Sequence, residues 1–84
     1  MSKYAAIYTP DYRLRLMGFS HPDSTKTKEY VNGKGDVVIR CQRSYLYGIG
    51  WYWYVNGEVR EYSFSKRLLI DMMERSGVYS LVQS

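Results

Sequence analysis

The residues that could do chemistry are few in this chain of 84 residues. It contains one histidine, His21, and one cysteine, Cys41, whereas a structural zinc site needs several such ligands. His21 stands in a polar loop with no visible orienting partner, so we expect it to be solvated rather than catalytic. Glu58 and Glu61 fall on opposite faces of a predicted hairpin, which makes them poor acid–base partners. The sequence therefore predicts a protein without enzymatic activity, metal or cofactor.

The basic residues point to an acidic partner. Twelve lysines and arginines against eight acidic residues give a formal net charge of +4, which suits a nucleic acid or an acidic protein face. Arg13 and Arg15 alternate with apolar residues in Tyr12–Phe19, so both are expected on one face of a strand. That face is either simply solvated or contacts phosphate or carboxylate groups. Lys66 and Arg67 are candidates for the same contacts, because the first turn of a helix disfavours cations.

The most distinctive stretch, Arg40–Phe64, holds both tryptophans and half of the ten tyrosines. Asn56-Gly57 within it predicts a two-residue hairpin turn. This turn sets a register whose opposed pairs are Val55–Glu58, Tyr54–Val59, Trp53–Arg60, Tyr52–Glu61 and Trp51–Tyr62. The pairing of Trp53 with Arg60 predicts a cation–π contact.

Alternation along the hairpin places Trp51 and Trp53 on one face and most of the tyrosines on the other. A single helix covers only one face of a sheet. We expect the tryptophans beneath the helix, because they have more apolar area to remove from water. The uncovered face is then expected to hold Tyr52 and Tyr54, together with Tyr45 or Tyr47. A second interpretation stays open, in which individual tyrosines belong to the core.

Hydropathy patterns predict further strands outside the hairpin. These are Lys3–Thr9, Tyr12–Phe19, Lys28–Val31, Asp36–Gln42 and Val78–Val82. Cys41 falls on the more apolar face of its strand and is expected to behave as a small hydrophobic residue.

One helix is predicted at Ser65–Ser76, with Ser63 or Ser65 as N-cap and Gly77 as C-cap. Its predicted apolar stripe consists of Leu68, Leu69, Met72 and Met73. Together the elements predict a single α+β domain over residues 1–84. We expect a twisted, mainly antiparallel sheet of five to six strands with one C-terminal helix packed on one face.

The sequence also predicts a cytoplasmic protein. A lone cysteine forms no intrachain disulfide, whereas small secreted domains usually depend on such bridges. The first residues lack the apolar segment of a signal peptide, and no stretch is long and apolar enough for a membrane span.

The first functional hypothesis is a protein-binding module that acts as a small inhibitor or adaptor. Exposed tyrosines near arginines have the composition of interface hot spots. The candidate partner-binding residues are Tyr45, Tyr47, Tyr52, Tyr54, Arg40, Arg43 and Arg60. An exposed strand edge could also pair two copies into a homodimer.

The alternative hypothesis is a nucleic-acid-binding protein. Its tyrosines would stack on bases, and its phosphate contacts would come from Arg13, Arg15, Arg40 and Arg43. Against it, basic and acidic residues alternate through the hairpin and helix, and no nucleic-acid-binding motif is present.

In its small size and aromatic richness the chain resembles the small accessory proteins of phages and mobile elements, although no motif supports this. The resemblance implies a role in blocking a host protein or complex.

Overall fold

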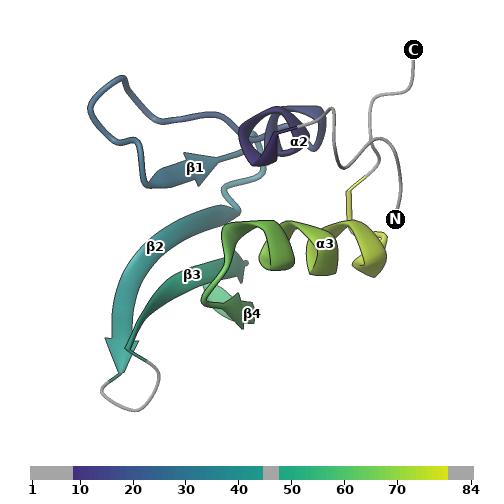
Figure 1. The fold of residues 1–84 in the computed structure, drawn as a ribbon. Helices are drawn as coiled ribbons and strands as arrows, with labels where there is room; N and C mark the ends of the chain where they lie inside the picture. Colours follow the sequence, from purple (N-terminus) through teal and green to yellow (C-terminus); the bar gives the residue numbers. More distant parts are fainter. Residues whose placement is uncertain (1–8, 45–47, 80–84) are drawn as a thin grey trace.

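The computed structural model describes residues 9–44 and 48–79 (Figure 1). The elements in chain order are α2 (Pro10–Leu16), β1 (Glu29–Val31), β2 (Val37–Ser44), β3 (Gly48–Val55), β4 (Glu58–Ser63) and α3 (Lys66–Ser76). The described strands form one antiparallel sheet in the order β1-β2-β3-β4. The α+β class and the antiparallel sheet are therefore confirmed.

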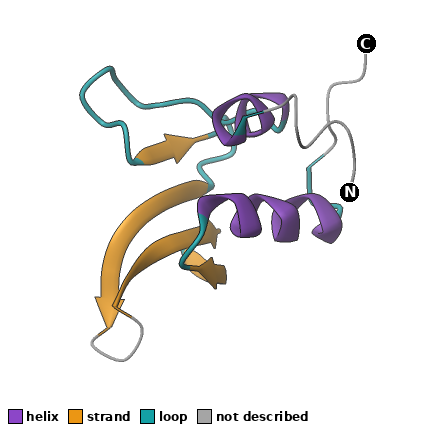
Figure 2. Ribbon diagram, in the orientation of Figure 1, coloured by secondary structure: helices purple, strands orange, loops and turns teal. Residues whose placement is uncertain are grey.

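Both described helices share one hydrophobic core with the sheet, and they lie on the same side of it (Figure 2). The core consists of Leu14, Met17, Phe19, Tyr30, Val38, Trp51, Trp53, Leu69, Ile70, Met73 and Tyr79. We call the sheet face that carries Trp51 and Trp53 the inner face, and the opposite one the outer face. No helix among the described residues packs on the outer face.

The predicted strand Tyr12–Phe19 is wrong, because this segment begins as helix α2. Thr9 is its N-cap, and its hydroxyl accepts a hydrogen bond from the Tyr12 backbone N–H at 3.2 Å. Pro10 occupies the first turn together with Asp11, as is favourable at a helix start. These capping signals, together with burial of one side of the helix, outweigh a period-two pattern only a few residues long.

The predicted count of five to six strands is only partly matched, because the described residues contain four. Lys3–Thr9 lies almost entirely outside the described residues, as does most of Val78–Val82. The two described residues of the latter, Val78 and Tyr79, are not in a strand. The short strand β1 and its hairpin partner β2 agree with the prediction.

The β3–β4 hairpin has the predicted turn, since Asn56 and Gly57 both have positive φ, at 55° and 80°. Val55–Glu58 and Tyr54–Val59 pair as expected, but a β-bulge at Arg60 then shifts the register. Beyond it the observed pairs are Trp53–Glu61, Tyr52–Tyr62 and Trp51–Ser63, so the predicted register is wrong there. The cation–π contact is nevertheless confirmed, because the Arg60 guanidinium lies 5.2 Å from the centre of the Trp53 ring.

Helix α3 has the predicted ends. The Ser65 hydroxyl accepts a hydrogen bond from the Leu68 backbone N–H at 3.3 Å, and Gly77 ends the helix with φ of 73°. Its buried residues are Leu69, Ile70 and Met73. Leu68, which was expected in the apolar stripe, is exposed instead.

Candidate functional site

The tryptophans lie where the sequence predicts them, on the inner face beneath the helices. Trp53 is fully buried, and its indole N–H donates to the Tyr79 hydroxyl at 2.9 Å. That hydroxyl donates in turn to a buried Asp36 carboxylate at 2.7 Å. Burial, with the Asp36 hydrogen bond, raises the pKa of Tyr79 above its ordinary value. These buried hydrogen bonds fix the sheet to the segment after α3. The rings of Trp53 and Tyr79 are therefore not accessible to a partner.

The expected exposure of Tyr52 is wrong, because only 2% of this residue is exposed. The bulge at Arg60 moves Tyr62 from the predicted inner face to the outer face, where its ring centre lies 4.7 Å from that of Tyr52. The Tyr52 hydroxyl is buried without a hydrogen-bond partner in residues 9–44 and 48–79. Tyr52 is therefore part of a packed outer face rather than of an open aromatic surface.

The remaining predicted tyrosines are only partly placed. Tyr54 is half-buried. Tyr45, Tyr47 and the Arg43 side chain lie outside the described residues. Cys41 is half-buried on the outer face, opposite Gly50.

Gly50 allows the Tyr62 ring to approach the backbone of β3 closely. A Cβ at this position would lie 2.4 Å from Cε2 of Tyr62, so no other residue fits without displacing the ring. Phe64 continues the series, with its ring centre 5.4 Å from that of Tyr62 in an edge-on arrangement. The three rings thus pack in series, from the buried Tyr52 through Tyr62 to the exposed Phe64.

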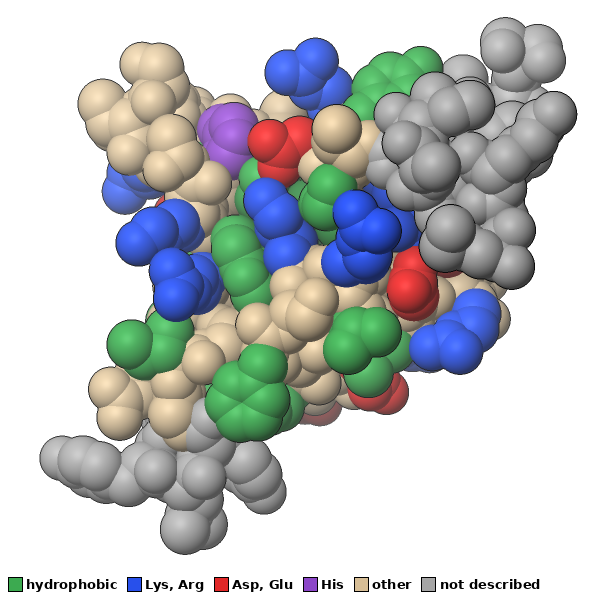
Figure 3. All heavy atoms as spheres, in the orientation of Figure 1, with side chains coloured by type: hydrophobic (Ala, Val, Ile, Leu, Met, Phe, Trp, Pro, Cys, Tyr) green, Lys and Arg blue, Asp and Glu red, His purple; other side chains and the backbone are tan. Residues whose placement is uncertain are grey.

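Phe64, the exposed end of this series of rings, lies between the end of β4 and the start of α3. Phe64 is 72% exposed and Leu68 is 53% exposed. Figure 3 shows hydrophobic side chains gathered over this part of the molecule. We call Tyr62, Phe64 and Leu68 the junction patch. Sequence reasoning missed it, although Phe64 stands immediately before the N-cap, where neither the strand nor the helix buries it.

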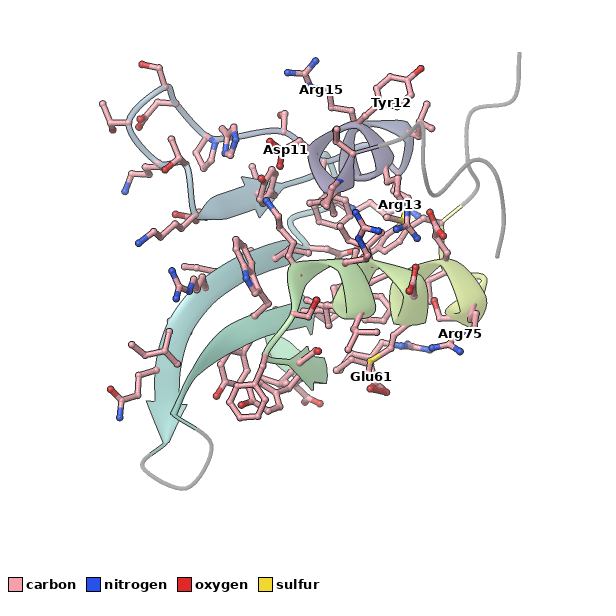
Figure 4. The ribbon with its side chains drawn as sticks, in the orientation of Figure 1. Asp11, Tyr12, Arg13, Arg15, Glu61 and Arg75 are labelled. Carbon is pink, nitrogen blue, oxygen red and sulfur yellow. The ribbon has the colours of Figure 1, made fainter. Side chains whose placement is uncertain are left out.

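Arg13 does not lie on a shared face with Arg15. It is buried, and its guanidinium donates to both Glu74 oxygens at 3.0 and 2.6 Å and also to Asp71. The hydrogen bonds that Arg13 donates to Glu74 outweigh the effect of burial and raise the pKa of Arg13 above its ordinary value. Arg15 is exposed and points away from α3, whereas Arg13 points toward it (Figure 4). Arg13 therefore joins α2 to α3, and only Arg15 remains in solvent.

Lys66 lies in a cluster of partners at the start of α3. Its ammonium donates to Asp11 at 2.9 Å and to the Tyr30 hydroxyl at 3.1 Å, while Tyr30 also donates to Asp11. The Tyr30 hydrogen bond, followed by that from Lys66, holds the pKa of Asp11 below its ordinary value. Burial acts to lower the pKa of Lys66, but its hydrogen bonds to Tyr30 and Asp11 outweigh that effect and raise it. The cluster thus pairs the Lys66 ammonium with the Asp11 carboxylate and satisfies the Tyr30 hydroxyl.

The other predicted arginines are dispersed. Arg40 is exposed on the inner face opposite Trp51, whose ring centre is also 5.0 Å from the Lys66 ammonium. Arg60 covers Trp53 farther along the sheet, and Arg67 is exposed on α3. Of the predicted basic residues, Lys66 thus lies over the Trp51 ring and Arg40 is the cross-strand neighbour of Trp51, whereas Arg60 lies apart over Trp53.

His21 packs its ring against Tyr30 with 4.3 Å between ring centres, and its Nδ1 lies 3.0 Å from the Glu29 carbonyl oxygen. Among the described residues, no group of three or more His, Cys, Asp or Glu side chains could hold a metal ion. None of the helices in these ranges is long and apolar enough to cross a membrane.

No protein-family model matches the chain, and no curated protein or solved structure is significantly similar to it.

Proposed function

We propose that this protein is a non-enzymatic protein-binding module, a small inhibitor or adaptor that docks on a larger protein or complex through the junction patch. The exposure of Phe64 is the observation that supports this best. Burying a phenylalanine side chain stabilises by about 1.5–3 kcal/mol, which this chain leaves unused in its own fold. Aromatic residues, phenylalanine included, are enriched at protein interfaces, and adjoining exposed apolar side chains mark interaction sites.

The patch is held in place before any partner arrives. Phe64 packs edge-on against Tyr62, which in turn packs on Tyr52. On its other side, the Ser65 backbone N–H donates to the Ser63 hydroxyl at 3.1 Å. The ring contact restrains the Phe64 side chain and the hydrogen bond restrains its backbone, so less conformational entropy is lost on binding, which favours affinity.

Docking by surface contact fits the structure better than strand addition. Strand β4 is an edge of the described sheet, so a homodimer or a partner strand could in principle extend it. The bulge at Arg60 interrupts its regular hydrogen-bonding pattern, as bulges commonly do at protected edges. The side chains of the junction patch, rather than the backbone of β4, are therefore the proposed contact.

The experiment is affinity purification from the native host with the double variant Phe64→Ala/Leu68→Ala. The wild-type chain is expected to retain one stoichiometric protein after nuclease treatment, and the double variant is expected to lose it. Tyr12→Ala is the control, because Tyr12 is also an exposed aromatic residue but lies on α2 (Figure 4). Equal retention by wild type and folded double variant would refute the proposed patch.

A further inference from the structure

A second surface lies on the inner face, beyond the start of α3. Arg40 pairs with Trp51 on one side, and on the other its backbone N–H donates to the Lys28 carbonyl at 3.0 Å. The register of β1 with β2 places Lys28 opposite Arg40, one pair beyond Glu29 and Ile39. Lys66 closes the series from above Trp51, 5.0 Å from the ring centre. We call Lys28, Arg40 and Lys66 the basic row.

The fold accounts for Lys66, which pairs with Asp11, but it gives no reason for placing Lys28 and Arg40 opposite each other. Lys28 and Arg40 are exposed, and neither makes an ion pair with any residue in the described ranges. Like charges directly opposite each other on adjacent strands destabilise a sheet. Glu29 does not compensate them, because it alternates onto the outer face with Ile39. Within residues 9–44 and 48–79, Asp11 is the one carboxylate that forms an ion pair with a member of the row.

Figure 3 shows the same feature as a gathering of Lys and Arg side chains over β1, β2 and the start of α3, with few acidic side chains among them. The acidic residues of α3, Asp71 and Glu74, lie in its second half and are engaged by Arg13. Of the three charges in the basic row, only that of Lys66 is paired with a carboxylate of the described residues, and those of Lys28 and Arg40 are not.

We infer that the basic row binds the phosphodiester backbone of double-stranded nucleic acid. Arginine and lysine are the usual donors to phosphate oxygens, and such contacts position a protein on a duplex without reading its sequence. Single strands are instead held by bases stacked on open aromatic rings. Trp51 is only 9% exposed and Tyr30 is buried, so the row offers no such ring.

The absence of apolar exposure separates this surface from a protein-docking site. The large hydrophobic side chains exposed in residues 9–44 and 48–79 are Tyr12, Ile49, Phe64 and Leu68, and none of them lies on β1 or β2. Protein interfaces usually bury an apolar centre within a polar rim. The row thus goes beyond the proposed docking function and uses different residues.

The test is the binding of a short fluorescent DNA duplex, an RNA duplex and a single-stranded oligonucleotide, each measured by anisotropy over a series of salt concentrations. We expect the duplexes to bind more tightly than the single strand, and the tighter duplex identifies the source of the phosphates. Each phosphate contact contributes about −0.9 to the slope of log K against log salt, so a row of three predicts about −2.7.

Lys28→Gln/Arg40→Gln should reduce this slope to about −0.9, with the fold checked by circular dichroism. Arg15→Gln/Arg75→Gln is the matched control, because it removes the same charge from exposed positions at other sites (Figure 4). If the double variant unfolds, the salt dependence of duplex binding is measured with the single variant Lys28→Gln instead. The inference is overturned if no duplex binds at low salt, if both double variants lose binding equally, or if polyglutamate displaces the duplex as well as unlabelled duplex does.

Discussion

At the scale of single residues, two tyrosine hydroxyls in the same small fold have opposite environments. The Tyr52 hydroxyl is buried without a partner among the described residues, whereas the Tyr79 hydroxyl joins Trp53 to Asp36. A buried hydroxyl without a hydrogen-bond partner lowers the stability of the fold. Removing a hydroxyl that is the partner of other buried polar groups also lowers it.

Tyr52→Phe is therefore expected to leave the free energy of unfolding unchanged or raise it by up to about 1 kcal/mol. Tyr79→Phe is expected to lower it by about 1–3 kcal/mol, because the Trp53 N–H and a buried Asp36 oxygen lose a partner. Urea unfolding of both variants measures the difference. A destabilised Tyr52→Phe would show that the hydroxyl has a partner after all.

Gly50 tests the close contact with Tyr62. Gly50→Ala should lower the free energy of unfolding by about 1–3 kcal/mol, because the new methyl group displaces the Tyr62 ring. Gly33→Ala is its control, since that glycine has no positive φ and no atom within 4 Å of the added Cβ. Equal thermal stability of the two variants would mean that Tyr62 is free to move aside.

At the scale of elements, α2 is fixed by charge at two points. Arg13 connects it to α3 through Glu74 and Asp71, and Asp11 connects it to Lys66 and Tyr30. The short helix would not be stable alone, since isolated helices of this length are marginal in water.

Asp11 makes part of this stability depend on pH. Its pKa is lowered in the fold, so its contribution is present above the unfolded value near 3.8 and is lost as pH falls through the folded pKa. Asp11→Asn should therefore unfold with a weaker dependence on pH over this acid range than wild type. Glu58→Gln changes an exposed carboxylate that makes no ion pair with any described residue, and its acid dependence should match wild type. A pH dependence of Asp11→Asn equal to that of wild type would exclude this role.

Local signals explain which elements the sequence predicts. The Asn56-Gly57 turn and the ends of α3 follow from residues adjacent in the chain, and both agree with the structure. Helix α2 was missed because its alternating apolar residues also fit a strand. The bulge at Arg60 has no local signature, and it decides which face Tyr62 occupies.

At the scale of the whole molecule, the described sheet is covered by helices on one face only (Figure 1). The sequence correctly assigns the tryptophans to the covered face. It does not reveal that the tyrosines of the outer face pack on one another, because that depends on cross-strand neighbours set by the bulge. Burial of Tyr52 shifts the candidate partner contact from the middle of the hairpin to its end, where Phe64 is exposed.

The two proposed surfaces differ in chemistry and can be tested separately. The junction patch is apolar and aromatic. The basic row is cationic, and the aromatic residues next to it, Trp51 and Tyr30, are buried. Substitutions in the basic row leave Phe64 and Leu68 unchanged. Substitutions in the basic row should therefore abolish nucleic-acid binding and leave protein binding intact. Substitutions in the junction patch should do the opposite.

The central claim is that Phe64 is an anchor for a protein partner. Its most direct test is calorimetric titration of the captured partner with wild type, Phe64→Ala and the control Tyr12→Ala. We predict that Phe64→Ala raises the dissociation constant about 30-fold or more, as expected for a hot spot of about 2 kcal/mol, while Tyr12→Ala changes it little. Equal dissociation constants for wild type and a folded Phe64→Ala would contradict the claim.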